Sequence, residues 1–182
     1  MQSRSTISPE YRAQQQELHK NPDYGVASLG YAPTVKTLME QFGTKSISDY
    51  GAGKCNLRRA LHELGKSDFE YFPYDPAFPE YGAPRPADLV CCIDVLEHIE
   101  IEFLDAVLSD LKDITRDLGF FSIHTGAAVK HLPDGRNAHL IQKSSSWWLP
   151  QLCRYFEIAH LQGSPGGFWV MAEPRSDVSR NG

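Results

Sequence analysis

Several features that would assign a protein class directly are missing from this sequence. Its four cysteines include no Cys-x-x-Cys pair, so we predict no zinc site and no other metal site. No apolar run reaches the ~18 residues that a membrane-spanning helix needs. The first twenty residues contain no apolar stretch, so they are not expected to form a signal peptide. Together these absences predict a cytoplasmic protein whose thiols are reduced and buried.

Positive charge is also scarce. The chain has 18 Lys and Arg against 23 Asp and Glu, a net charge of −5. Because nucleic-acid-binding proteins usually carry a basic face, a large nucleic-acid interface is disfavoured. The sequence contains no internal repeat, and 182 residues are a normal length for one domain.

The order of hydrophobic patterns predicts an α/β fold. Residues 87–93 (ADLVCCI) form a near-continuous apolar run, which is typical of a central parallel strand covered by helices on both faces. Cys91 and Cys92 would then point to opposite faces of the sheet. Further strands are expected over 46–50, 69–74, 120–124, 157–161 and 168–172, and helices over 9–20, 32–42, 103–118, 144–155 and the segment that ends at Gly65. We predict a Rossmann-like three-layer sandwich, whose mainly parallel sheet ends in a C-terminal antiparallel hairpin.

The chain divides into three segments in this scheme. Residues 1–45 are expected to form N-terminal helices that act as a lid, although packing against the sheet edge explains them equally well. Residues 46–173 form the α/β domain, and residues 174–182 are expected to be a disordered tail.

Polar groups gather where the expected strands end. Asp49-Tyr50-Gly51-Ala52-Gly53 follows a strand and opens a helix, and its glycines allow the backbone to turn sharply and approach a ligand closely. Asp75 ends the next strand, where its carboxylate can accept hydrogen bonds from both hydroxyls of a ribose. Because ligands of such sheets bind beyond the carboxyl ends of the strands, these groups predict a cofactor site.

In this order, the segments DYGAGKCNLRRAL, YDP and DLVCCIDVLEHI resemble the class I S-adenosylmethionine-dependent methyltransferases, particularly the small ones of phages and bacteria. The resemblance covers roughly residues 46–124. It implies that S-adenosyl-L-methionine is the cofactor and that Asp75 holds its ribose. It also implies that Asp94 lies near the methionine amino group or the substrate. The other expected cofactor contacts are Tyr24, Asp49, Gly51, Ala52, Gly53, Pro76, Phe78, Val95 and His98.

The interval between Asp75 and residue 87 departs from the family pattern. The usual family has a helix, a strand and an acidic loop there, whereas residues 76–86 carry too many prolines for a helix. The sheet is therefore expected to be shortened between its second and central strands. Pro76 and Phe78 could pack on the adenine instead, but filling core space is an equally good explanation for Phe78.

A nicotinamide-binding Rossmann protein is the main competing interpretation. Such proteins prefer Gly-x-Gly-x-x-Gly, and the position three residues after Gly53 is Asn56. The motif therefore favours S-adenosylmethionine over NAD.

Candidate catalytic residues follow the strand expected to end at His124. Methyl transfer needs a positioned nucleophile, and a base only if the nucleophile must lose a proton early. The polar loop 126–143 contains Arg136 and His139, which could orient a polar acceptor and remove its proton. A solvated loop is the alternative explanation. We take His124, His139 and Arg136 as the catalytic candidates.

These observations predict a methyltransferase acting on a small-molecule acceptor that the 126–143 loop positions. A catalytically silent cofactor-binding partner protein remains an alternative. Nucleic-acid methylation is disfavoured by the acidic balance and by the absence of an Asn/Asp-Pro-Pro-Tyr/Phe motif. The oligomeric state is left open.

Overall fold

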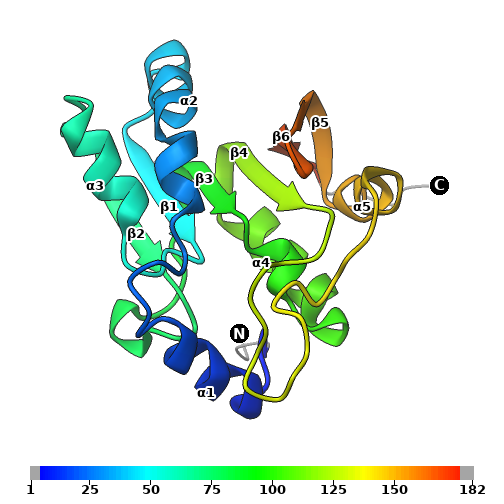
Figure 1. The fold of residues 1–182 in the computed structure, drawn as a ribbon. Helices are drawn as coiled ribbons and strands as arrows, with labels where there is room; N and C mark the ends of the chain where they lie inside the picture. The colour runs from blue at the N-terminus through cyan, green and yellow to red at the C-terminus, as the bar shows by residue number, and fades with distance from the viewer. Residues whose placement is uncertain (1–4, 177–182) are drawn as a thin grey trace.

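A six-stranded sheet in the order β2-β1-β3-β4-β6-β5 forms the middle layer of the protein (Figure 1). The structure is a computed structural model that describes residues 5–176. Its strands are β1 (Ser46–Tyr50), β2 (Glu70–Tyr74), β3 (Ala87–Ile93), β4 (Thr115–His124), β5 (Phe156–Ser164) and β6 (Gly167–Pro174). Its helices are α1 (Pro9–Leu18), α2 (Ala27–Phe42), α3 (Asn56–Glu63), α4 (Leu104–Ile114) and α5 (Ser145–Leu152), with short 3-10 helices η1 (Pro79–Tyr81), η2 (Leu96–His98) and η3 (Ile101–Phe103).

Strands β1 to β4 are parallel, and β6 runs antiparallel to both β4 and β5. This arrangement confirms the mainly parallel sheet with a C-terminal antiparallel hairpin. Helices α2 and α3 cover one face of the sheet and α4 and α5 cover the other. As expected, Cys91 and Cys92 of β3 point to opposite faces of the sheet. Cys91 packs with α2 and α3, and Cys92 packs with α4 and α5. The protein is therefore a three-layer sandwich.

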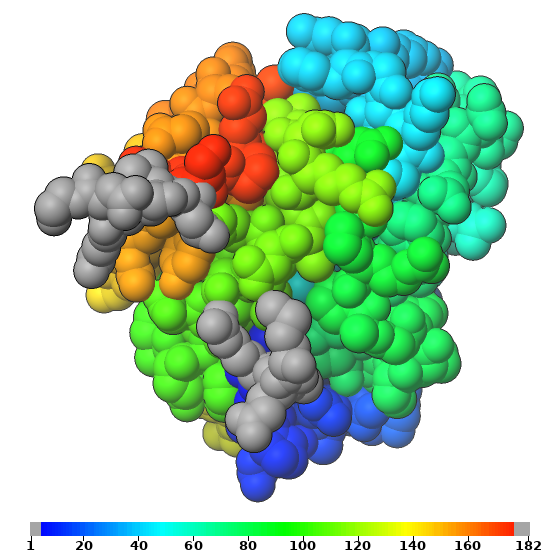
Figure 2. Space-filling view, turned by 180° about the vertical axis from the view of Figure 1, so that it is seen from behind, coloured from blue at the N-terminus to red at the C-terminus, as the bar shows by residue number. Residues whose placement is uncertain are grey.

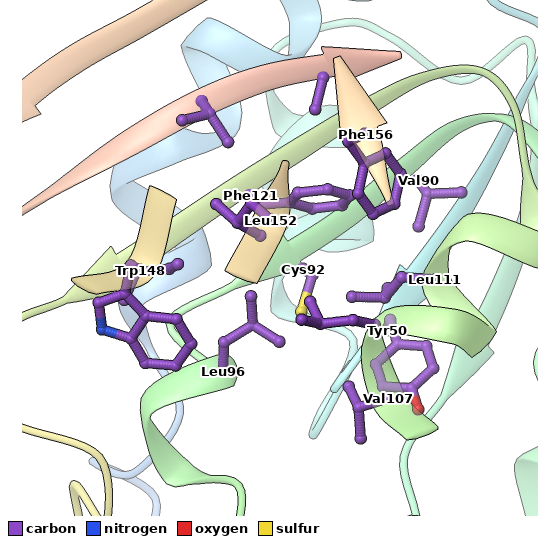
Figure 3. Packing of buried hydrophobic residues seen from close by; sticks show 14 of the residues in the cluster. Tyr50, Val90, Cys92, Leu96, Val107, Leu111, Phe121, Trp148, Leu152 and Phe156 are labelled. Atoms are coloured by element: carbon purple, nitrogen blue, oxygen red, sulfur yellow. The ribbon is translucent and has the colours of Figure 1, made fainter. Parts of the chain in front are cut away.

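Large side chains fill the layer between the sheet and the helices α4 and α5. Figure 3 shows Phe121 of β4, Trp148 of α5 and Phe156 of β5 in this core, with Leu111 of α4 nearby. All four are fully buried. Close packing of this layer fixes β4 against α4.

Helix α1 lies across the end of the sheet at which the parallel strands finish (Figure 1). Ser8 caps the helix, since its side chain accepts a hydrogen bond from the Tyr11 N–H, and Pro9 occupies the first helical position. Tyr11 packs in a small third core with Leu132 and Ala138 of the 126–143 loop. Seen from behind, α1 forms the lower end of the molecule (Figure 2). The helix and the loop thus form one cover over the strand ends.

The shortened connection between β2 and β3 is confirmed. Residues 75–86, all of which the structure describes, contain only the single turn of η1. The six-stranded sheet accordingly begins at β2.

Two helix boundaries differ most from the sequence prediction. We expected the second helix to begin near Ala32-Pro33, but α2 begins at Ala27 and holds Pro33 inside it. A proline there removes one helical hydrogen bond, and burial of Val35 and Met39 on the sheet offsets the loss. We also expected a helix to residue 118, whereas α4 ends at Ile114. Thr115 turns into extended conformation and begins β4 opposite Ala87.

The C-terminal boundary falls later than expected. Pro174 ends β6, and the Arg175 backbone N–H donates to the Tyr155 carbonyl at 2.9 Å. The remainder of the expected tail, residues 177–182, lies outside the described residues. In the part of the chain that the structure describes, no helix is long and apolar enough to cross a membrane.

The core against α4 and α5 predicts a large stability difference between two phenylalanines. Phe121 is fully buried, whereas Phe42 is 53% exposed at the end of α2. Phe121→Ala should lower the free energy of unfolding by about 3–5 kcal/mol because it leaves a cavity. Phe42→Ala, the matched control, should change it by less than about 0.5 kcal/mol. Urea unfolding followed by circular dichroism measures both, and equal losses would contradict this description of the core.

Candidate active site

A cavity of about 380 Å³ opens at the carboxyl ends of the parallel strands, beneath α1. Most of its lining comes from five parts of the chain: α1 with the turn that follows, the Gly51–Gly53 loop, the segment after β2, the segment after β3, and the 126–143 loop. All but two of the residues predicted as site residues line this cavity. They are Tyr24, Asp49, Gly51, Ala52, Gly53, Asp75, Pro76, Asp94, Val95, His98, His124 and His139. The two that do not are Phe78 and Arg136.

The glycine loop is shaped by a close approach that only glycine permits. Gly51 has φ +84°, and a Cβ there would lie 2.3 Å from Cγ2 of Val95. The N–H groups of Gly51 and Ala52 both donate to the Tyr74 carbonyl, at 2.7 and 3.0 Å. The loop is therefore held between the end of β2 and the segment after β3.

Asp75 lies directly after β2 and is buried. One carboxylate oxygen accepts from the Gly53 N–H at 3.0 Å and the other from the Ala77 N–H at 2.8 Å. Burial raises the pKa of this carboxyl, while the two backbone donors act to lower it. Since a carboxylate oxygen can accept more than one hydrogen bond, both oxygens keep acceptor capacity for a ligand.

Asp49, at the carboxyl half of β1, is also buried. Its carboxylate accepts a hydrogen bond from the Tyr71 hydroxyl. Burial raises the pKa of Asp49 to about 7; the Tyr71 hydrogen bond opposes this shift and the nearby Asp75 adds to it. A carboxyl perturbed to this extent inside a cavity is typical of a functional site.

A chain of hydrogen bonds ties the N-terminal segment to the site. The Tyr24 hydroxyl donates to Gln15 Oε1 at 3.0 Å, Gln15 Nε2 donates to the Tyr11 hydroxyl at 2.6 Å, and that hydroxyl donates to the His98 carbonyl at 2.7 Å. Burial raises the pKa of Tyr24 to about 12, so its hydroxyl remains protonated at neutral pH. The network places Tyr24 on the cavity wall.

His19 follows α1 and covers the glycine loop. Its ring would contact a Cβ at Gly53 at 3.0 Å, and its Nε2 is 4.0 Å from Asp75 Oδ2. Burial, with a contribution from Lys54, lowers the pKa of His19 to about 4, so the ring is neutral at physiological pH. His19 is therefore a neutral polar group over Asp75.

Asp94 directly follows β3 in a left-handed conformation, with φ +51°. Such a conformation is uncommon outside glycine and is often found at functional sites. Its backbone N–H donates to the Ser122 hydroxyl at 3.0 Å, and that hydroxyl donates to Asp94 Oδ1 at 2.7 Å. β4 thus holds Asp94 at the cavity wall.

Three histidine rings form a row along the opposite wall. The ring centroid of His139 is 4.8 Å from that of His98 and 4.8 Å from that of His124. The His98 Nδ1 lies 2.7 Å from the Ala138 carbonyl, and the His139 Nδ1 lies 2.7 Å from the Gly126 carbonyl. Burial lowers the pKa of His98 to about 3 and also lowers that of His139. At neutral pH both rings are uncharged.

Glu97 lies behind this row and is fully buried. Its Oε1 accepts from the His124 backbone N–H at 2.8 Å. Its Oε2 has no hydrogen-bond partner among the described residues. Burial, and then the proximity of Asp94, raise the pKa of Glu97 to about 8.

The cation of the 126–143 loop that reaches the cavity is Lys130 rather than Arg136. Arg136 is exposed and pairs with Asp134 at 2.8 Å. Lys130 lines the cavity, and its Nζ is buried 5.3 Å from the centre of the Tyr24 ring with no hydrogen-bond partner within residues 5–176. Which of the two cations reaches the cavity depends on how the loop folds, and the sequence does not reveal that.

Phe78 lies beside the cavity rather than in its wall. Its ring stacks on Tyr81 at 5.4 Å and meets the edge of His19 at 4.9 Å. Phe78 therefore supports His19.

Four residues of the site were not among the sequence candidates: Gln15, His19, Lys130 and Glu97. Lys130 lies in the polar loop that the sequence singled out, and Glu97 in the DVLEHI segment. Gln15 and His19 carry no such signal, because only the docking of α1 brings them over the glycine loop.

Solved structures with a similar architecture are methyltransferases. The chain is similar to the Burkholderia thailandensis 1,6-didemethyltoxoflavin-N1-methyltransferase, with a TM-score of 0.64 and 17% identity over 96% of this chain and 93% of that chain. It is also similar to the magnesium protoporphyrin IX methyltransferase of Synechocystis PCC 6803, with a TM-score of 0.53 and 15% identity over 92% and 95%. The chain has the class I methyltransferase fold.

Larger methyltransferases share this fold. A mitomycin 7-O-methyltransferase matches 89% of this chain with a TM-score of 0.61 and 15% identity, and the chain spans 60% of that protein's length. No family sequence model matches the chain, and no curated protein is detectably similar to it in sequence. At these identities the comparisons establish only the fold of this chain.

The close approach of Gly51 to Val95 predicts an energetic coupling between the two positions. Gly51→Ala should lower the free energy of unfolding by about 1–3 kcal/mol, because the new Cβ overlaps Val95 and the left-handed backbone is strained. The double variant Gly51→Ala/Val95→Ala should lose less than the sum of the single variants.

Gly30→Ala is the matched control for this cycle. Gly30 lies inside α2 with nothing within 4 Å of a Cβ, so the substitution should be neutral or slightly stabilising. Urea denaturation gives all four values. Strict additivity of the two single variants would show that Val95 does not shape the loop.

Proposed function

We propose that this protein is an S-adenosyl-L-methionine-dependent methyltransferase that acts on a small-molecule acceptor. The observation that carries the proposal is a single cavity with two chemically different walls. One wall consists of the Gly51–Gly53 loop and Asp75, and the other of His98, His139 and Lys130. Two similar structures, the didemethyltoxoflavin and magnesium protoporphyrin IX methyltransferases, were solved with bound S-adenosylhomocysteine.

The wall formed by the glycine loop suits the cofactor. The Gly53 and Ala77 N–H groups orient Asp75, which keeps acceptor capacity on both oxygens for the ribose hydroxyls. Asp49 and Asp94 add negative groups beside the loop, which favours a cofactor that carries an ammonium and a sulfonium. Gly51, Ala52, Pro76, Val95 and Tyr24 would supply the remaining contacts.

The histidine wall suits the acceptor. His98 and His139 are neutral, so each can accept a hydrogen bond from a polar acceptor, and Lys130 can pair with an acidic group on it. His124 closes the end of this wall. Because Arg136 lies outside the cavity, Lys130 takes the role of orienting the acceptor that the sequence analysis gave to Arg136.

The dimensions of the cavity favour a small acceptor. A volume of about 380 Å³ lies in the usual range for small-molecule sites, and α1 together with the 126–143 loop covers it. A nucleic acid would need an open, basic groove instead.

The cofactor assignment predicts that the protein binds S-adenosylhomocysteine and not NAD. Asp75→Ala should weaken S-adenosylhomocysteine binding by about 10- to 100-fold, since charge-assisted hydrogen bonds to the ribose would be lost. Isothermal titration calorimetry measures both ligands on both proteins.

Two further variants make the calorimetry decisive. Asp75→Asn keeps an acceptor for a backbone N–H and should preserve the loop while still weakening binding. Asp68→Asn, at an exposed position after α3, should bind like the unaltered protein. Heat with NAD but none with S-adenosylhomocysteine would refute the proposal, and unchanged affinity in both Asp75 variants would refute the ribose contact.

A further inference from the structure

Three potential metal ligands from separate segments meet at the histidine wall. Glu97 and His98 belong to η2, after β3, and His139 comes from the loop after β4. One nitrogen of each ring and one carboxylate oxygen all lie within 4.8 Å of one another. A metal about 2.0–2.2 Å from each ligand atom requires separations of roughly 3–4 Å, so small side-chain rotations would close the site.

The unpartnered oxygen of Glu97 points to the same conclusion independently. This side chain is fully buried, Oε1 is engaged by the His124 N–H, and Oε2 has no partner among residues 5–176. A buried acceptor without a partner is costly. Since Oε2 is the carboxylate oxygen left without a partner, a bound cation would satisfy it.

The hydrogen bonds of the two rings engage Nδ1 of each and leave Nε2 of each free to bind a ligand. A backbone carbonyl can only accept, so the Nδ1 of His98 donates its hydrogen to Ala138 and the Nδ1 of His139 donates to Gly126. The Nε2 lone pair of each neutral ring is then available. A backbone carbonyl that orients the ring in this way is typical of metal-binding histidines.

His124 is arranged differently, although its ring is equally near. His124 Nδ1 lies 3.1 Å from the Gly126 N–H and 3.3 Å from the Gly126 carbonyl; the shorter contact makes Nδ1 an acceptor and leaves the hydrogen of that ring on Nε2. A Cβ at Gly166 would lie 2.4 Å from this Nε2, so Nε2 faces the β5–β6 turn. His124 therefore does not belong to the ligand set.

We propose that Glu97, His98 and His139 bind a divalent first-row transition-metal ion at the acceptor wall. Two imidazoles and one carboxylate, with positions left open, suit Zn²⁺, Fe²⁺, Co²⁺ or Mn²⁺. The open positions face the cavity, because His98 and His139 line it while Glu97 lies behind them. The sequence predicted no metal site because it contains no Cys-x-x-Cys pair. Ligands at positions 97, 98 and 139 do not form a comparable short motif.

The ion would define the acceptor class, and this part of the inference rests on the proposed function. A hydroxyl oxygen of the acceptor would occupy an open position and release its proton to solvent. The resulting oxyanion would form the new O–CH₃ bond as the C–S bond of the sulfonium breaks, which leaves S-adenosylhomocysteine. The acceptor class is thus a hydroxyl compound that can coordinate a metal.

The test titrates the full chain, stripped of metal by a chelator, with Co²⁺. We expect one ion per chain, a visible absorption band typical of four- or five-coordinate Co²⁺, and displacement of the ion by Zn²⁺. His139→Ala and Glu97→Gln should each weaken Co²⁺ binding by at least about tenfold. His131→Ala is the matched control, because this ring lies in the same loop but is exposed, and it should bind Co²⁺ like the unaltered protein.

Calorimetry with S-adenosylhomocysteine on the same samples reports folding and keeps the two proposals separate. Glu97→Gln keeps an oxygen for the His124 N–H, which preserves the local structure. No Co²⁺ band in a protein that binds S-adenosylhomocysteine would overturn the metal site. Co²⁺ binding that survives both His139→Ala and Glu97→Gln would overturn it as well. Co²⁺ binding without S-adenosylhomocysteine binding would refute the proposed function and support the metal site.

Discussion

The parallel direction of β1 to β4 is the constraint on which the site depends. Parallel strands must all end at one edge of the sheet, so the groups that follow them converge although they are far apart in sequence. Asp49, Asp75, Asp94 and His124 occupy these ends in turn. Each is then fixed by a neighbouring element rather than by its own strand, as the bonds from Gly53 to Asp75 and from Ser122 to Asp94 show. The sheet determines where these groups lie, and hydrogen bonds from neighbouring elements determine how they are oriented.

The cover over this edge determines the character of the cavity. Helix α1 and the 126–143 loop pack on each other through Tyr11 and Leu132, and both bring neutral or weakly basic groups to the cavity, among them His19 and His139. Asp49, Asp75 and Asp94 line the cavity, whereas the 126–143 loop brings one cation to it, Lys130. Carboxyl groups therefore outnumber the cation that this loop supplies. An enclosed space of this kind favours positively charged ligands, and a sulfonium cofactor and a divalent ion both meet that requirement.

The sequence predicted the parts of the molecule whose signal is local. The apolar run of β3, the glycines at 51 and 53 and the carboxylate at 75 depend on a few adjacent residues, and the structure has them as expected. Pro33 misled the prediction of α2 because burial of one helical face outweighs a missing hydrogen bond. The position of Arg136 outside the cavity and of Lys130 inside it follows from how an irregular loop docks on α1. No periodic pattern encodes that docking.

The raised pKa of Asp49 shows how stability and ligand binding are linked at this edge of the sheet. An unfolded aspartate has a pKa near 3.8, whereas burial in the folded protein raises the pKa of Asp49 to about 7. The folded state thus binds this proton more tightly, and Asp49 costs the folded protein increasing stability as the pH rises from about 4 to about 7. Above that range the carboxylate is ionised and buried, with the Tyr71 hydroxyl as its hydrogen-bond donor. A cationic ligand in the cavity offsets part of this cost, so the same charge that weakens the empty protein strengthens its affinity for a sulfonium.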